Sequence, residues 1–277
     1  MPERLYLELL KKSLTRVLVG PERTWRPLPP GTKRIVDAVL RVPPARRLAA
    51  ARLRRFFPGE TMLPLERLDH LQACIRQIVD EEIPGDVIET GVWRGGATIF
   101  MRGALEAYGD KKRVVWVADS FEGLPKPKAD LYPEDEGDRT WTLAGWLAVP
   151  LTEVKANFER YGLLDERVRF LPGWFSETLP DAPIERLSLL RLDGDIYEST
   201  IVALRALYPK VSPGGFVIVD DYGAVSGCRA AVEDFRSAEG ITEPLEAIDW
   251  SSVCWRKQRG ASVTERASAR EARSAAA

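Results

Sequence analysis

The 277-residue chain has a single histidine and only three cysteines. Cys74, Cys228 and Cys254 follow no spacing typical of a disulfide framework or a metal or redox motif, so we expect reduced thiols and a cytoplasmic location. Apolar runs of membrane-spanning length are also missing, and we expect no membrane partner. The formal net charge is only -1, which offers no general attraction to nucleic acid.

Hydrophobic residues nevertheless make up 45% of the chain, enough for a sizeable core. Leucines recur at helical spacing over residues 3–19 and 64–83, and 33–56 is expected to be helical on either side of Pro43-Pro44. The histidine, His70, lies on the expected helix 64–83, where we expect a surface or locally bonded side chain. Residues 1–84 therefore read as a helical N-terminal extension.

From residue 85 onward, short apolar runs alternate with helical stretches, as in a doubly wound, mostly parallel α/β sheet. Strands are expected at 86–90, 113–119, 167–171, 186–193 and 215–220, with weaker candidates at 245–249 and 251–257. Helices are expected at 96–108, 151–161, 198–208 and 226–238. This domain is expected to end near residue 258, because 259–277 lacks core residues and is predicted to be a disordered tail.

One connection, residues 125–150, is unusually long for such a domain. It is rich in proline, glycine and acids and carries Trp141 and Trp146. A segment of this length is more often a functional lid than a plain linker. We expect it to be too polar for burial and to close over the site, with one of the two tryptophans as an apolar wall.

Carboxylates end two of the expected strands. Asp193 and Asp195 follow one strand, and Asp220 and Asp221 end another. Carboxyl ends of parallel strands meet at one edge of a sheet, so these four acids are expected to gather there. Like charges repel unless a cation or proton compensates, and an all-oxygen site without histidine or cysteine favours Mg²⁺, Mn²⁺ or Ca²⁺ over zinc.

A nucleoside-binding turn is expected after the first strand. Gly91 permits a tight turn, and Gly95-Gly96 permits close approach of ligand or backbone. This is not the dinucleotide pattern, so a small charged group such as the methionine part of S-adenosylmethionine fits better. Asp119, at the end of the second strand, could accept the hydroxyls of a ribose. Trp174, Phe175 and Ser176 could flank an adenine, or the two aromatic rings could simply pack in the core.

Four motifs together resemble the macrocin and mycinamicin sugar O-methyltransferases of antibiotic biosynthesis. They are Glu89-Thr90-Gly91-Val92 with Arg94-Gly95-Gly96, Asp119-Ser120-Phe121-Glu122-Gly123-Leu124-Pro125, Asp193-Gly194-Asp195-Ile196-Tyr197, and Asp220-Asp221-Tyr222. The resemblance covers roughly residues 61–257 and implies a class I, Rossmann-like methyltransferase fold, S-adenosylmethionine, a magnesium or manganese ion and a glycosylated small-molecule acceptor.

The resemblance also implies roles for individual residues. Asp193, Asp220 and Asp221 match the metal ligands, and Asp195 matches the general base. Thr61-Met62 matches a segment that reaches over the cofactor. The first 60 residues lie outside the resemblance, and we expect residues 1–84 to make oligomer and acceptor contacts in a homo-oligomer. The cofactor-binding set expected from the motifs and the resemblance comprises Thr61, Met62, Glu89, Thr90, Gly91, Val92, Arg94, Gly95, Asp119, Ser120, Trp174, Phe175, Ser176 and Asp193.

Two alternatives use the same residues. A catechol-type O-methyltransferase needs the same aspartate geometry with an aromatic diol as acceptor, and activity on a simple catechol would favour it. A non-catalytic protein that only binds S-adenosylmethionine would be favoured by loss of a metal aspartate, and the sequence retains all of them.

Overall fold

The structure is a computed structural model that describes residues 2–23, 35 and 38–258. Its centre is a seven-stranded sheet of order β3-β2-β1-β4-β5-β7-β6. The strands are β1 (Asp86–Thr90), β2 (Val115–Asp119), β3 (Val168–Pro172), β4 (Leu187–Leu192), β5 (Val211–Val219), β6 (Glu246–Ala247) and β7 (Val253–Arg256). The first five in this order run parallel, and β7 pairs antiparallel with β5 and β6.

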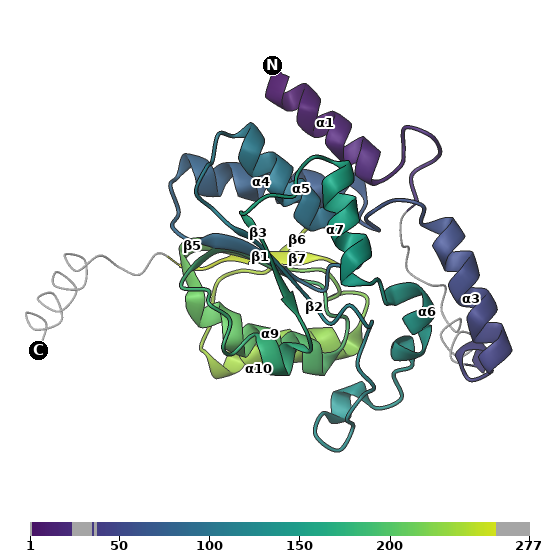
Figure 1. The fold of residues 1–277 in the computed structure, drawn as a ribbon. Helices are drawn as coiled ribbons and strands as arrows, with labels where there is room; N and C mark the ends of the chain where they lie inside the picture. Colours follow the sequence, from purple (N-terminus) through teal and green to yellow (C-terminus); the bar gives the residue numbers. More distant parts are fainter. Residues whose placement is uncertain (1, 24–34, 36–37, 259–277) are drawn as a thin grey trace, which may run out of the picture.

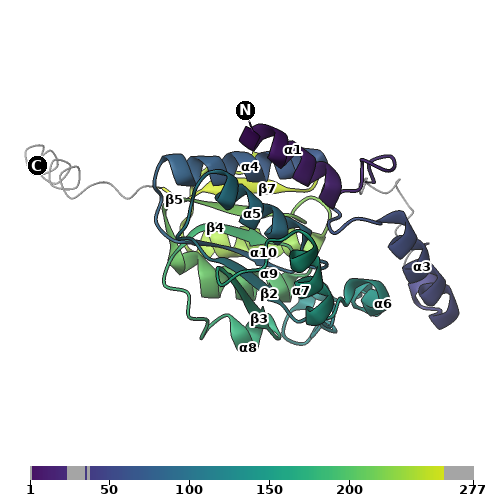
Figure 2. The ribbon, with the colours of Figure 1, turned by 45° about the horizontal axis from the view of Figure 1, so that its top comes forward.

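Helices cover both faces of the sheet (Figures 1 and 2). The helices are α1 (Pro2–Leu14), α3 (Pro43–Phe56), α4 (Leu65–Asp80), α5 (Gly96–Ala107), α6 (Ala144–Leu147), α7 (Leu151–Arg160), α8 (Phe175–Thr178), α9 (Tyr197–Leu207) and α10 (Ser226–Ala238), with short 3-10 turns η1 (Pro133–Asp135), η2 (Thr140–Leu143) and η3 (Tyr208–Lys210). In Figure 1, α4, α5 and α7 lie above the sheet and α9 and α10 below it. The expected doubly wound α/β fold is therefore confirmed.

The strands form because apolar residues project alternately to the two faces of the sheet. In β1, Val87 joins the core under α4 and α5, and its neighbour Ile88 joins the core under α9 and α10. Both side chains are fully buried. A continuous apolar run is what a strand covered on both faces requires.

The strand order places the functional edge of the sheet. From β1 the chain adds β2 and β3 on one side and then crosses over to place β4 on the other side of β1, so the carboxyl ends of β1 and β4 lie side by side where the order reverses. Such a crevice is where open α/β sheets bind ligands. Leu192 pairs with Val219, which brings the acids that follow β4 and β5 to one level.

Several expected boundaries differ, and α1 ends at Leu14 instead of 19. β5 begins at Val211 instead of 215, because Val211 pairs with Leu187 ahead of an irregularity in the ladder. β6 has only two residues. Helix lies on either side of residue 42 as expected near the prolines, with residues 38–40 helical and both prolines in the first turn of α3, where proline is tolerated.

The N-terminal extension is helical as expected where the structure describes it. α1 packs on α5, α4 packs on β4 and β5, and α3 lies beside α6 (Figure 2). Part of the expected helix 33–56 and the whole predicted tail 259–277 lie outside the described residues. None of the helices described here has both the length and the apolar character of a membrane span.

Candidate active site

Three aspartates converge at the carboxyl ends of β4 and β5. One carboxylate oxygen from each of Asp193, Asp220 and Asp221 lies within 4.8 Å of the others. Two neighbouring parallel strands bring them together, since Asp193 follows β4 and the other two follow β5. The expected clustering of these three acids is therefore present in the structure.

Two arginines that sequence reasoning missed hold this cluster. Arg191 on β4 is buried and donates hydrogen bonds to Glu89, Asp193 and Asp220, with 2.8 Å between its Nη1 and Asp193 Oδ2. Arg67 on α4 donates to Asp220 at 2.5 Å. A charged residue inside the apolar run of β4 was the available signal, because a buried guanidinium needs carboxylate partners.

The carboxylates of this cluster outnumber the two guanidinium groups of Arg67 and Arg191. The pKa values of several of these carboxyl groups are raised. Burial, followed by the neighbouring carboxylates, raises the pKa of Asp195 to about 8 and also raises the pKa values of Asp193 and Asp221. Burial raises the pKa of Glu89 to about 8 despite its bond to Arg191. Burial and the neighbouring carboxylates therefore both oppose full ionisation of this acidic group when no cation is present.

A divalent cation fits this donor set. Among the described residues, Asp221 Oδ2 is buried without a hydrogen-bond partner. Orphaned buried carboxylate oxygens are costly, and hard cations take such oxygens as ligands. The residues present thus match a metal site built from Asp193, Asp220 and Asp221, in which Asp220 also bonds both arginines.

A cavity lined in part by Asp193 and Asp195 opens at this edge of the sheet. Gly91 lines its floor, with φ of +87°, and a Cβ there would lie 1.9 Å from the carbonyl oxygen of Asp193. Only glycine permits this turn and this close approach. The cavity is lined by Met62, Gly91, Trp93, Asp119, Ser120, Gly123, Leu124, Pro125, Leu147, Trp174, Phe175, Asp193, Gly194, Asp195 and Ser199.

Asp119 lies in this cavity at the end of β2. Its two oxygens accept the backbone N–H groups of Val92 and Phe121, both at 2.7 Å. Burial raises the pKa of its carboxyl group, and the backbone hydrogen bonds oppose that shift. Its Oδ1 also accepts a long hydrogen bond of 3.5 Å from the Ser120 hydroxyl, which a ribose hydroxyl could replace.

Asp195 combines burial with an unusual backbone. Its φ is +60°, a left-handed conformation that a residue other than glycine adopts only when its surroundings hold it there. The following residues start α9, and Asp195 lines the cavity next to Asp193. This position points a carboxyl group of raised pKa at the cavity.

Several residues expected to contact a cofactor have other surroundings. Arg94 donates to the carbonyl oxygens of Phe57 and Gly59 and stacks on Trp93 at 4.1 Å. Gly95 faces α7, where a Cβ would lie 2.9 Å from Val154. The Gly95-Gly96 pair therefore serves close packing of backbone against neighbouring elements.

Five more of the expected cofactor residues are absent from the cavity lining. Glu89 bonds Arg191 behind the site, and the Oγ1 of Thr61 accepts the N–H of Leu63. Thr90, Val92 and Ser176 also lie outside the lining, and Ser176 borders a second hollow instead. By contrast, Met62, Gly91, Asp119, Ser120, Trp174, Phe175 and Asp193 all line the cavity.

The segment 125–150 is folded rather than a plain loop. The expectation that it is too polar for burial is wrong at Asp135, which is 2% exposed and accepts the N–H groups of Tyr197 and Glu198 at the start of α9. Trp146 is buried as well, against Phe57 and Trp93. The segment is thus tied down at two points.

Trp141 occupies a different position. It lines a second hollow, together with Lys126, Lys128 and Glu198. This hollow shares Leu124, Pro125, Trp174, Phe175 and Ser199 with the first cavity. Of the two tryptophans, Trp141 is therefore the one available as an apolar wall.

The sequence and the fold were compared with known protein families, proteins and solved structures. The macrocin-O-methyltransferase (TylF) family model matches residues 3–257. The chain is 52% identical over 254 residues to 8-demethyl-8-(2,3-dimethoxy-alpha-L-rhamnosyl)-tetracenomycin-C 4'-O-methyltransferase of Streptomyces olivaceus, covering 91% of this chain and 92% of that protein. It is 50% identical over 201 residues to mycinamicin III 3''-O-methyltransferase of Micromonospora griseorubida, covering 72% and 79%. The solved structure of the O-methyltransferase NovP superposes with a TM-score of 0.78 at 42% identity, covering 93% of this chain and 100% of NovP.

Proposed function

The chain belongs to the macrocin-O-methyltransferase family and is an S-adenosylmethionine-dependent O-methyltransferase, and on that premise we propose that it methylates a sugar hydroxyl of a glycosylated natural product with the help of a divalent metal ion. The observation that carries this proposal is the convergence of Asp193, Asp220 and Asp221 at the edge of a cavity that Asp193 and Asp195 line. The resemblance read from the sequence motifs agrees with the family match.

We assign the cavity lined by Gly91, Asp119 and Asp193 to the cofactor. S-Adenosylmethionine supplies, when bound, a methyl group that is already activated by the positive sulfur. The Asp119 carboxylate would accept the ribose hydroxyls, and the side-chain-free turn at Gly91 would admit the methionine part. Trp174 and Phe175 line the same cavity and offer apolar surface to the adenine.

We assign metal binding to Asp193, Asp220 and Asp221. A divalent cation supplies, when bound, positive charge that makes a neighbouring hydroxyl more acidic. Arg191 keeps Asp193 and Asp220 in place by its hydrogen bonds, and Arg67 does the same for Asp220. Fixed ligands of this kind orient an acceptor before reaction.

Asp195 is the proposed general base. It lines the cavity next to Asp193, and burial raises its pKa, which makes its carboxylate form a stronger proton acceptor. The acceptor hydroxyl would pass its proton to Asp195 while its oxygen bonds to the methyl carbon and the bond from that carbon to sulfur breaks. Thus Asp195 is the one residue of the acidic group to which we give a direct chemical role.

The second hollow suits the acceptor. Its lining combines the Trp141 ring with Lys126, Lys128 and Glu198, which offers both an apolar wall and polar groups to a glycosylated molecule. We propose that residues 125–150 close over this acceptor, with Asp135 and Trp146 as anchors. A catechol-type acceptor remains the alternative, since it would use the same aspartates.

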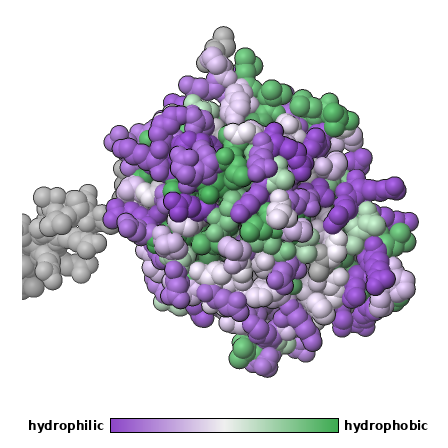
Figure 3. Space-filling view, viewed as in Figure 1, coloured by the Kyte–Doolittle hydropathy of each residue, from purple (hydrophilic) through white to green (hydrophobic). Residues whose placement is uncertain are grey.

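The N-terminal extension is assigned to acceptor and subunit contacts. Met62 from this extension lines the cavity. Exposed hydrophobic residues, including Leu5, Leu9 and Val19, lie on α1 and the segment after it, and Figure 3 shows hydrophobic residues gathered at the top of the molecule over this region. Exposed apolar patches of this kind mark association surfaces, which supports a homo-oligomer.

Metal removal and acceptor choice test the proposal together. Dialysis against EDTA should abolish methyl transfer to a rhamnosylated polyketide, and Mg²⁺ or Mn²⁺ should restore it. Full activity in excess chelator would contradict the metal assignment. A higher kcat/KM on a simple catechol than on the glycosylated acceptor would favour the alternative.

A further inference from the structure

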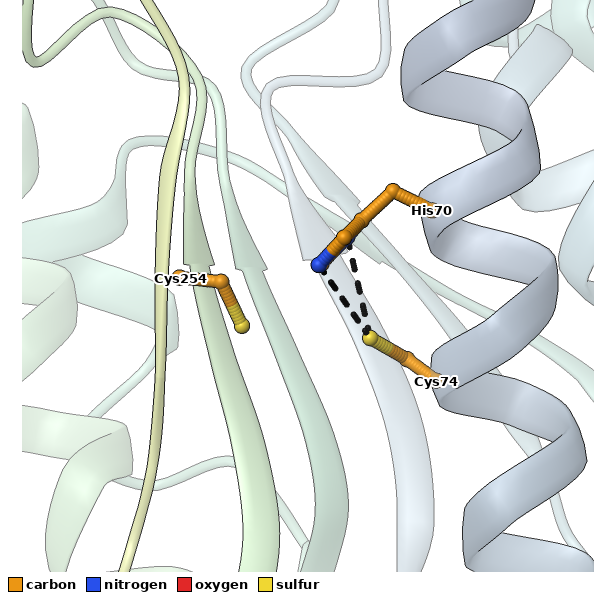
Figure 4. Close-up of side chains that lie close together, drawn as sticks. All are labelled: His70, Cys74 and Cys254. Atoms are coloured by element: carbon orange, nitrogen blue, oxygen red, sulfur yellow. Dashed lines mark hydrogen bonds between the residues drawn. The ribbon is translucent and has the colours of Figure 1, made fainter. Parts of the chain in front are cut away.

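A second group of metal-ligand side chains lies between α4 and β7. His70 and Cys74 project from α4, and Cys254 projects toward them from β7 (Figure 4). One ligand atom from each lies within 4.8 Å of the others. The Cys74 Sγ is 3.7 Å from Nδ1 and 4.0 Å from Nε2 of His70.

Rigid elements bring the three side chains together. His70 and Cys74 are four residues apart and therefore share one helix face, which is the face that α4 packs on the sheet through Leu71, Ile75 and Ile78. Cys254 pairs with Ile218 on β5, so its backbone is held in the sheet. No loop has to move for these side chains to meet.

The side chains of His70, Cys74 and Cys254 carry polar atoms, although apolar residues surround them. Cys74 is 2% and Cys254 is 3% exposed, and both belong to the core under α4. Buried free cysteines often serve as small hydrophobic residues. An imidazole directed at two buried thiols is not explained by that role, and among the described residues His70 has no hydrogen-bond partner other than the thiols.

We propose that His70, Cys74 and Cys254 bind one Zn²⁺ ion. Zinc bonds of about 2.3 Å to sulfur and about 2.0–2.1 Å to nitrogen place tetrahedral N and S ligands roughly 3.6 Å apart, close to the spacing of His70 and Cys74. Two thiolates neutralise Zn²⁺, which suits a buried apolar site, and each thiol releases its proton on binding. Three protein ligands leave a fourth position for water.

The two metal sites should not compete. Thiolate and imidazole ligands select zinc and other soft or borderline ions, whereas the carboxylates of Asp193, Asp220 and Asp221 select Mg²⁺ or Mn²⁺. Zinc would also join α4 to β7. Arg67 lies one turn before His70 on α4 and bonds Asp220, so zinc would steady the helix that supports the acidic site.

The test is a metal titration of the full chain under reducing conditions. Bound metal is first removed, and saturating Mg²⁺ is then added to fill the acidic site. Co²⁺ should produce thiolate-to-cobalt charge-transfer absorption at one equivalent per chain, and Zn²⁺ should displace it. Cys74→Ser and Cys254→Ser should lower Zn²⁺ affinity by about 100-fold or more, and His70→Gln by a smaller factor. Cys228→Ser removes the buried cysteine outside the cluster and should bind as the wild type does.

Two further measurements keep the test decisive. Zn²⁺ should raise the Tm of the wild type at saturating Mg²⁺, and Asp221→Asn should leave this rise unchanged while weakening Mg²⁺ binding. If a cysteine variant fails to fold by circular dichroism, the His70→Gln variant and the wild-type Tm decide the matter. Absence of thiolate-to-cobalt absorption in the reduced wild type, or equal binding by Cys74→Ser, would overturn the zinc site and leave the methyltransferase proposal intact.

Discussion

Replacing Arg67 by glutamine should destabilise the metal-free protein strongly and make it depend on Mg²⁺. Arg67 bonds Asp220 at 2.5 Å and Asp249 at 2.6 and 3.0 Å, and its side chain is only 10% exposed. Removing one partner from a buried ion pair costs about 3–5 kcal/mol, because a carboxylate remains buried without its cation. We therefore expect the free energy of unfolding of the metal-free variant to fall by about 3–5 kcal/mol.

Mg²⁺ should recover part of this loss. Without Arg67, Asp220 regains a free oxygen and the site becomes more negative, so a divalent cation binds more tightly than in the wild type. Ligand at 100 times its Kd stabilises the folded state by about 2.7 kcal/mol. The contacts to Asp249 lie on the far side of the guanidinium and should stay lost.

Urea unfolding followed by circular dichroism, with and without Mg²⁺, measures these effects. Arg76→Gln is the matched control, since Arg76 lies on the same helix but makes an exposed pair with Asp80 and should change nothing measurable. A loss below about 1 kcal/mol in the metal-free variant would refute the account of a buried, undercompensated acidic site. So would an equal effect of Mg²⁺ on variant and wild type.

Four other predictions concern the same region. Asp195→Asn should lower turnover by about 100-fold or more with little change in Mg²⁺ or cofactor affinity, because the amide cannot accept a proton; an equal loss of Mg²⁺ affinity in a metal titration would make Asp195 a ligand rather than the base. Asp119→Ala should weaken S-adenosylhomocysteine by about 1.5–3 kcal/mol in calorimetry, and unchanged affinity would remove it from the cofactor site. Glu89 has a pKa of about 8 in the folded protein against its ordinary 4.5, so between these pH values the folded metal-free protein holds a proton that the unfolded chain has lost, and its stability should fall as pH rises from 4.5 through 8. Glu89→Gln should flatten that part of the plot of Tm against pH, and an unchanged plot would contradict the raised pKa of Glu89. Cofactor plus acceptor should protect residues 125–150 from limited proteolysis, and trimming them should impair acceptor turnover more than cofactor binding; equal cleavage rates with and without ligands would reduce the segment to an ordinary surface loop.

Site residues whose position depends only on a local turn, or on directly following a strand, could be predicted from the sequence. The turn at Gly91, the carboxylate Asp119 and the three aspartates Asp193, Asp220 and Asp221 were all located this way. Each follows an apolar run, and the carboxyl ends of parallel strands share one edge of the sheet. The order of the runs along the chain was therefore enough to bring these groups to one site.

The tertiary structure alone decided which side chains surround that site. Arg67 meets Asp249 across 182 positions of the sequence, and Cys254 meets His70 only because β7 inserts antiparallel beside β5. Trp141 and Trp146 look alike in the sequence, yet one lines a hollow and the other is buried. Local patterns specify strands, helices and turns, whereas burial and charge partners depend on contacts between residues far apart in the chain, and these exist only once the elements have packed.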